Sequence, residues 1–313
     1  MIEDKSMGII RVTSRMLVDR TLTDLAYQTR RILTLQEQLS SGQRVNRPSD
    51  DPLSARRAIS AQSMIAQNEQ YIKNITTIRP YLNETETTIT TTLDIVQRAR
   101  ELAIQGRNTT NAQLQRDQIA TEVNQLIEAL LKESNHQTNG RYIFGGTATN
   151  SAPFQETRNA NGEIASVSYT GNDNYISVEI MEGTQVVTNQ TGREVFLSTG
   201  AQSTDIFQTL ISLRDDLRSA NFTGIEQRIQ EANYAISQLS LALAKVGAVS
   251  KRLDTTEENL RTANIEFQRV ISDSIDADLA EVVVNLNTQT NAYQAALNAA
   301  SRVIQPSLLD YLR

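Results

Sequence analysis

The chain has 313 residues, of which 39% are hydrophobic, 21% charged and only 5% aromatic, with a formal net charge of −6. This content exceeds that of disordered chains and favours helices packed on helices over a sheet sandwich. The absence of Cys excludes disulfides, thiolate metal sites and cysteine nucleophiles, and the acidic balance indicates no nucleic-acid partner.

The N-terminal part predicts a helix that pairs with another helix. Residues 1–21 have acidic groups near the front and no continuous apolar core, so we expect no cleaved secretory signal. Separations of 3 and 4 then form an a/d heptad pattern, with Thr29 and Gln36 as its polar members. Its apolar members are Leu22, Leu25, Ile32 and Leu39. Gly42 ends this helix, since Gly is common just past a helix end.

A turn with two prolines follows. Each proline disfavours helix in the residue before it, and Ser or Asp can cap the next helix. The turn motif comprises Asn46, Pro48, Asp50, Asp51 and Pro52. Its shortness and its restricted backbone predict an ordered turn between helices rather than a flexible linker.

Helical periodicity continues on both sides of a different central segment. The expected helices before it span 53–77, 81–107 and 112–135, and helix resumes from Asp205 to Leu217 and again near Gly224. Between Arg141 and about Thr199, short runs of β-formers are separated by turn residues, which predicts β-hairpins. These runs are 142–144, 164–169, 175–180 and 185–187. Residues 142–201 hold six acidic and two basic residues, so this β insertion is acidic.

The C-terminal part carries the strongest heptad pattern in the chain. One stretch keeps 4/3 spacing at Val246, Val249, Leu253, Thr256, Leu260, Ala263, Phe267 and Val270. We expect a break at Ser272–Ser274, after which the spacing resumes at Leu279, Val283, Leu286, Thr290, Tyr293, Leu297, Ala300 and Ile304. Heptads at both ends predict an antiparallel pairing of the N- and C-terminal helices.

The terminal helix indicates assembly. Residues 282–301 form an uncharged run of 20, yet six Asn and Gln side chains make it unsuitable for a membrane span. A monomeric surface helix normally shows the solvent a charged stripe. We therefore expect the other faces of this helix to be covered by further subunits.

No residue cluster predicts catalysis. Asp273, Asp276, Asp278 and Glu281 invite a metal hypothesis, but acidic residues at a helix N-terminus are typical caps. The lone His136 has no second histidine or nucleophile elbow, which favours a solvent-facing or hydrogen-bonded role. The arginine excess of residues 1–60 is typical of a solvated or partner-facing surface.

Four stretches resemble one family. They are Arg11–Met16, LSSGQRVNRPSDDP at 39–52, GRYIFGG at 140–146, and the ending SIDADLAE…LLDYL. Together they are similar to the hook-filament junction proteins of bacterial flagella, which are relatives of flagellin. The likeness spans both helical ends and the first helical bundle, and the β insertion matches in outline. Met1–Ser6 precedes the usual start of such proteins.

The resemblance implies a mainly α fold with a small β insertion. It implies coiled-coil assembly segments at 1–46 and 276–313, a helical rod domain from 47–140 and 205–275, and a protruding β-hairpin domain at 141–204. Leu22, Leu25, Ile32 and Leu39 would pack with Leu286, Tyr293, Leu297 and Ile304 of the same or neighbouring subunits. The terminal segments would order on assembly.

The resemblance also implies a non-enzymatic adaptor without cofactors or bound metal. Its partners would be hook-associated protein 1, flagellin, other copies in a ring, an export chaperone and the type III export apparatus. It would lie in the flagellum outside the cell, or in the periplasm where flagella are internal. Two alternatives stay open: a flagellin-type filament subunit, and an exported enzyme on a flagellin scaffold.

Overall fold

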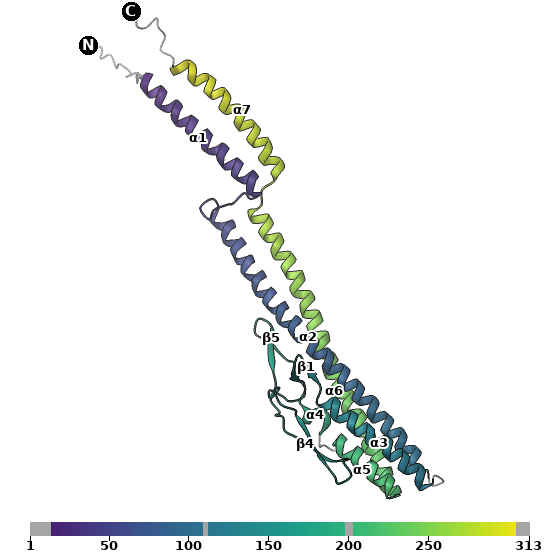
Figure 1. Ribbon diagram of the computed structural model, residues 1–313. Coiled ribbons are helices and arrows are strands. Elements are labelled where there is room, and N and C mark those ends of the chain that lie inside the picture. Colours follow the sequence, from purple (N-terminus) through teal and green to yellow (C-terminus); the bar gives the residue numbers. More distant parts are fainter. Residues whose placement is uncertain (1–13, 109–111, 198–202, 305–313) are drawn as a thin grey trace, which may run out of the picture. The chain divides into compact units, whose positions relative to one another are not determined.

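The computed structural model describes residues 14–108, 112–197 and 203–304 (Figure 1). Within these ranges the chain is mainly helical with three small antiparallel hairpins, which confirms the predicted fold class. It divides into a terminal unit, Met1–Ala66 with Asn264–Arg313, and a central unit, Gln67–Ala263.

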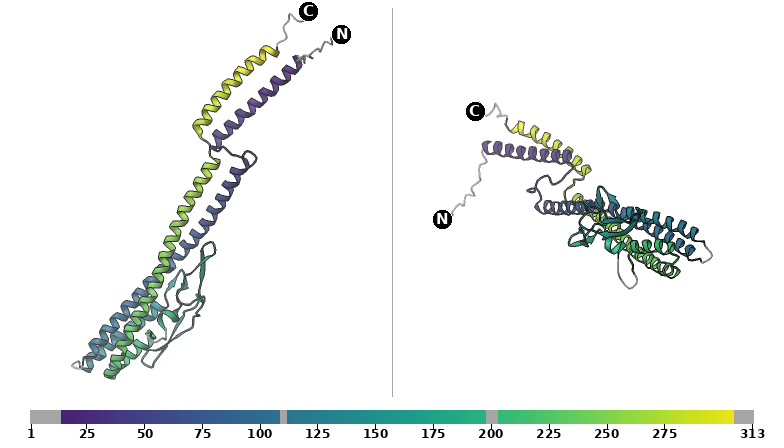
Figure 2. Two further views of the ribbon diagram at one scale, coloured as in Figure 1. Left: turned by 180° about the vertical axis from the view of Figure 1, so that it is seen from behind. Right: turned by 60° about the horizontal axis from the view of Figure 1, so that its bottom comes forward.

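Two helices lie wholly in the terminal unit and two long helices contribute to both units. In the terminal unit, α1 (Ser14–Ser41) and α7 (Leu279–Ile304) lie side by side in both views of Figure 2. The long helices are α2 (Pro52–Gly106) and α6 (Phe222–Ile275). The central unit adds α3 (Gln113–Ser134), α4 (Gly192–Phe196) and α5 (Ile206–Arg218).

One predicted helix break is wrong, and a second lies a few residues further along the chain than expected. α2 runs through Pro80 without interruption. The sequence predicts one helix before this proline, at 53–77, and a separate one after it, at 81–107. Pro80 and Thr76 are both exposed, so water can bind the Thr76 carbonyl that the proline leaves without a helical donor. α6 continues through Ser272–Ser274 to Ile275, and the expected break before Leu279 lies at 276–278.

The central unit has one hydrophobic core. Side chains from α2, α3, α5 and α6 meet in it, and each fully buried Leu or Ile contributes roughly 1.5–3 kcal/mol. Its completely buried members include Ile75, Ile89, Ile127, Leu130, Leu210 and Leu239. The heptad residues Val246, Leu253 and Leu260 of α6 are buried in the same core. Arg79 of α2 adds ion pairs to Asp254 and Glu257 of α6.

The β insertion consists of three two-stranded sheets. They pair β1 (Gln137–Thr138) with β2 (Arg141–Tyr142), β3 (Phe154–Arg158) with β4 (Ile164–Tyr169), and β5 (Ser177–Met181) with β6 (Thr184–Val187). The sequence predicts no strand at β1 or β3 and no helix at α4. It also extends the strand at 142 through Phe144, whereas Ile143 and Phe144 leave β2 and are buried.

An aromatic cluster anchors the insertion on the helices. Phe144 and Phe196 meet edge to face with ring centroids 5.0 Å apart, and Phe154 lies 5.3 Å from Phe196. Phe207 of α5 joins them at 5.5 Å from Phe154. Such aromatic pairs contribute about 0.5–1.5 kcal/mol beyond their burial, so this cluster fixes the hairpins against α5.

Gly146→Ala is expected to destabilise the central unit by about 3 kcal/mol or more, because an added Cβ overlaps a neighbouring backbone. Gly146 has φ +68°, and that Cβ would lie 2.1 Å from the Asn172 carbonyl oxygen. Gly162 is the matched control, since it has φ +79° and open space around it. Gly162→Ala should cost only about 1–2 kcal/mol of left-handed strain. Urea unfolding measures both, and equal losses would contradict a steric role for Gly146.

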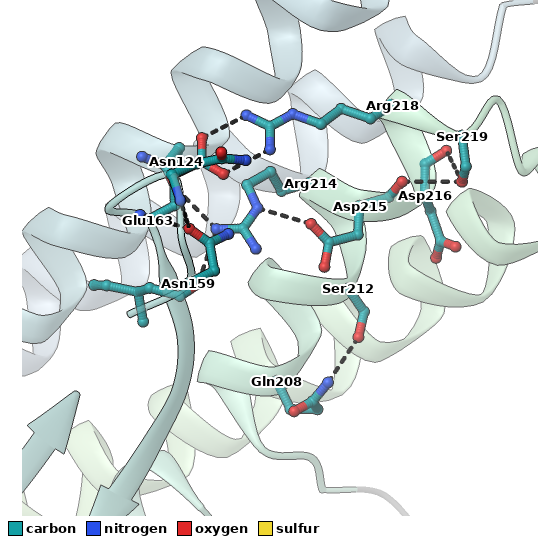
Figure 3. Close-up of polar contacts among 12 residues, drawn as sticks. Asn124, Asn159, Glu163, Gln208, Ser212, Arg214, Asp215, Asp216, Arg218 and Ser219 are labelled. Carbon is teal, nitrogen blue, oxygen red and sulfur yellow. Dashed lines mark hydrogen bonds and ion pairs between the residues drawn. The ribbon is translucent and has the colours of Figure 1, made fainter. Parts of the chain in front are cut away.

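Two arginines of α5 tie this helix to the insertion (Figure 3). The Arg214 side chain is only 2% exposed, and its Nη1 donates to Asn124 Oδ1 at 3.0 Å and to the Ile164 carbonyl at 2.9 Å. One turn later, Arg218 donates two hydrogen bonds of 2.6 and 2.7 Å to the Glu163 carboxylate. Both contacts hold the start of β4 against the helical bundle.

The Glu163 pair predicts acid sensitivity. Hydrogen bonds from Arg218 lower the pKa of Glu163 to about 2, below the ordinary 4.5. A lowered folded pKa means that the stabilisation is complete above about pH 4.5 and is lost as the pH falls through about 2. Glu163→Gln should therefore be less stable than the original chain at pH 7 by about 1–2 kcal/mol, a difference that shrinks towards pH 2. Thermal unfolding between pH 7 and pH 2 measures this difference in stability. Asp173→Asn is the control, because Asp173 belongs to an exposed ion pair with Arg193 that contributes little to stability.

Candidate assembly surface

α1 and α7 contact each other along one seam. On α1 the less exposed residues are Val18, Thr21, Leu25, Gln28, Ile32, Leu35 and Gln38. On α7 they are Val282, Leu286, Gln289, Thr290, Tyr293, Ala296 and Ala300. Both sets recur at intervals of three and four residues, as expected for two paired helices. We call these residues the α1–α7 seam.

The structure divides the predicted assembly residues into two groups. Leu25 and Ile32 of α1, with Leu286 and Tyr293 of α7, are half-buried members of the seam. The second group is exposed and consists of Leu22, Leu39, Leu279, Val283 and Leu297. Ile304 ends α7, and its side chain lies outside the described part. These five side chains stay 40–52% exposed in the described terminal unit.

The seam is polar at several positions. The Oε1 atom of Gln28 is buried without a hydrogen-bond partner among the described residues. Leaving a buried acceptor unpaired costs about 1–3 kcal/mol. Thr21 and Gln289 are further polar members, so the contact between α1 and α7 is weaker than a seam of Leu and Ile would be.

More large apolar side chains are exposed than buried in the described terminal unit. The exposed ones are Met16, Leu22, Tyr27, Leu33, Leu39, Leu53, Ile59, Met64, Ile265, Val270, Leu279, Val283, Val284 and Leu297. Buried apolar residues are Val45, Ala58, Ala61, Ile275, Val282 and Ala300, half of which are alanines. Contiguous exposed apolar surface is typical of interaction sites, which makes the terminal unit the candidate assembly surface.

The predicted turn motif forms a joint where the chain leaves α1. Gly42 has φ +71° and ends the helix. Asp50 accepts a hydrogen bond of 2.9 Å from the Arg47 amide, and the carboxylate of Asp51 caps α2 through the amides of Leu53 and Ser54. Hydrogen bonds from Ser54 lower the pKa of Asp51. Asn46 is half-buried, Pro48 is exposed, and Pro52 is the first residue of α2.

The same joint holds the turn between α6 and α7. Gln43 and Asp276 form an antiparallel bridge, flanked by a bond of 2.9 Å from the Ala277 amide to the Gly42 carbonyl. Arg44 makes the central contact. Its backbone amide donates a hydrogen bond of 2.7 Å to the Ile275 carbonyl, and its guanidinium donates one of 2.7 Å to the Ser274 carbonyl. The sequence reading counted Arg44 only as surface charge, because no pattern links it to a carbonyl 230 positions away.

The clustered carboxylates act locally. Asp278 caps α7 by accepting from the amides of Ala280 and Glu281, and Asp276 accepts from the Ser272 hydroxyl at 2.6 Å. No group of side chains suited to a metal ion occurs in the described part of the chain. His136 Nε2 lies 3.2 Å from the Glu84 carboxylate, a hydrogen-bonded role. Among described residues, no helix is long and apolar enough to cross a membrane.

Two family models match the N-terminal and C-terminal parts of the chain. The bacterial flagellin N-terminal helical region matches residues 12–149, and the bacterial flagellin C-terminal helical region matches 228–312. These matches include α1, α7 and both sides of the joint. The chain therefore belongs to the bacterial flagellin family.

Within that family, the chain is similar to hook-associated proteins. It is 25% identical over 315 residues to flagellar hook-associated protein 3 of Salmonella typhimurium, covering 93% of this chain and 95% of that one. It is 23% identical to the protein of that name from Escherichia coli, covering 93% and 96%. A putative flagellar hook-associated protein of Vibrio parahaemolyticus shares the fold at TM-score 0.64 and 19% identity, over 72% of this chain and 100% of that structure. The flagellar junction protein FlgL of Legionella pneumophila does so at TM-score 0.59 and 15% identity, with the same coverage.

Proposed function

We propose that this chain is a structural adaptor that joins the hook of a bacterial flagellum to its filament. The observation that carries this proposal is the exposed apolar surface of the terminal unit, which contains the paired α1 and α7. The likeness to hook-associated protein 3 over 93% of this chain supports the proposal.

The proposal includes the partners on each side. Hook-associated protein 1 binds towards the hook, flagellin binds towards the filament, and copies of this chain bind one another in a ring. The weak seam suits a chain that leaves the cell unfolded through the type III apparatus, with a chaperone on its C-terminal segment. The assembled chain lies outside the cell, or in the periplasm where flagella are internal, and performs no catalysis.

Deletion of the gene tests the proposal. We expect cells that build hooks of normal length without attached filaments and that release flagellin into the medium. A plasmid copy of the gene should restore attachment. Normal filaments in the deletion strain would refute the adaptor role.

A flagellin-type filament subunit is the second candidate. The chain is 26% identical over 292 residues to the flagellin of Bacillus subtilis, covering 88% of this chain. Under this alternative, purified chain would grow unaided into long filaments. Under the adaptor role, immunogold labelling shows a narrow band at the hook end, whereas a filament subunit is labelled along its whole length.

A further inference from the structure

α1 carries an arginine-rich groove on its exposed side. One hollow of about 410 Å³ lies where α1 meets the α1–α2 turn, and a second of about 360 Å³ continues along α1 and shares Arg30 and Thr34 with it. We define the arginine groove by Arg30, Arg31, Leu33, Thr34, Arg44 and Arg47. Leu33 is 59% exposed, so the groove offers apolar surface beside its positive charge.

The groove lacks sufficient counter-charge of its own. Its four arginines lie beside three carboxylates, those of Glu37, Asp50 and Asp51, and Asp51 is paired with Arg44 at 3.5 Å. Asp50 already accepts from the Arg47 amide, and the Arg47 ion pair with Glu37 is long at 3.8 Å and exposed. Within the described chain, Arg30 and Arg31 make no ion pair. The groove therefore suits a ligand that combines carboxylates with apolar side chains.

A segment of that chemistry lies at the start of α7. Residues 273–284 carry Asp273, Asp276, Asp278 and Glu281 and contain no Lys or Arg. In the same segment Val283 is 41% and Val284 is 64% exposed. Asp273 and Glu281 form no ion pair with any described residue, so their charges are available. We call residues 273–284 the acidic turn.

The acidic turn of the same chain does not fill the groove. Its backbone is bonded through Arg44 and Gln43 on the joint, while Asp273 and Glu281 stay free of Arg30 and Arg31. Apart from Arg44, which bonds the backbone of Ser274 and Ile275, the groove and the acidic turn are different surfaces with opposite charge. A contact between different surfaces of two copies is head-to-tail, and such contacts repeat around a ring or helix.

We infer that the arginine groove binds the acidic turn of a second copy of this chain. This inference rests on the proposed assembly at the junction and specifies which surfaces meet there. Leu33 and Val284 provide the apolar part of the contact, and Arg30 and Arg31 bind the carboxylates of Asp273 and Glu281.

Cross-linking in flagella tests this contact, since a chain without cysteine gives a clean background. Cells lacking the original gene make two differently tagged copies, one with Thr34→Cys in the groove and one with Val284→Cys in the acidic turn. A short bismaleimide is added to isolated flagella. We expect a product carrying both tags, at least tenfold stronger than the product from Thr23→Cys with Val284→Cys.

Thr23 is a matched control. Like Thr34 it is an exposed threonine of α1 whose hydroxyl bonds the carbonyl four residues earlier. It stands outside the groove, about 16 Å along the helix at 1.5 Å per residue. Equal yields from Thr34 and Thr23 in flagella with attached filaments would overturn the contact and leave the adaptor role intact. Filaments that attach without this gene would instead refute the adaptor role, and the cross-link would still decide whether copies meet through these surfaces.

Discussion

Leu22→Asp is expected to reduce the fraction of hooks that bear filaments at least about a hundredfold, without unfolding the free chain. Leu22 is 52% exposed and is not a member of the α1–α7 seam. A carboxylate there meets water in the free chain and costs little. In the proposed assembly this carboxylate would have to be buried.

The size of this effect follows from burial and repetition. Covering a leucine contributes roughly 1.5–3 kcal/mol, and burying an unpaired carboxylate in its place costs several kcal/mol more. Each 1.4 kcal/mol changes an equilibrium constant about tenfold, and the loss would recur in every copy of the proposed ring.

Leu114→Asp is the matched control for this experiment. Leu114 is a leucine of the central unit with 69% exposure, near the start of α3 where negative charge is favourable. We expect this variant to attach filaments within about twofold of the original chain. Circular dichroism of both purified variants checks folding, and motility with electron microscopy measures attachment. Equal loss of attachment in the two variants would show that the terminal unit has no special role.

The sequence predicted two paired terminal helices but could not select their contacting faces. A heptad drawn through Leu22, Leu25, Ile32 and Leu39 shares only Leu25 and Ile32 with the seam that the structure forms. The remaining seam positions include Thr21 and Gln28, which a search for apolar periodicity passes over. α1 has apolar residues on several sides, and the free chain covers only one of these sides. Apolar periodicity alone therefore does not identify the side that contacts α7.

Local chemistry was easier to predict than long-range contacts. The end of α1 at Gly42 and the cap at Asp51 depend on neighbours a few residues away, and both agree with the sequence. The continuity of α2 through Pro80 depends instead on the core that surrounds Ile78 and Leu82. Tertiary packing there outweighs a local cost of about 3 kcal/mol. Arg214 escaped notice for the same reason, since its partners are distant in sequence.

Arg214→Met is expected to destabilise the central unit by about 2–5 kcal/mol. Methionine keeps much of the apolar stem but removes the guanidinium. The Asn124 side-chain oxygen and the Ile164 carbonyl would then lose donors at 3.0 and 2.9 Å. Since this region is buried around Arg214, water cannot replace both bonds without opening the packing of β4 against α5.

Asp215→Ala separates this network from the neighbouring ion pair. Asp215 accepts from Arg214 Nε at 2.9 Å, but its side chain is 58% exposed, so its loss should cost at most about 1 kcal/mol. Urea unfolding of the free chain gives both free energies, and proteolysis between β4 and α5 reports whether the hairpin is released. Buried polar groups can be replaced by apolar ones at no cost in some proteins. If Arg214→Met leaves the stability unchanged, Arg214 is one of these replaceable buried groups. The aromatic cluster alone would then hold the insertion on the helices.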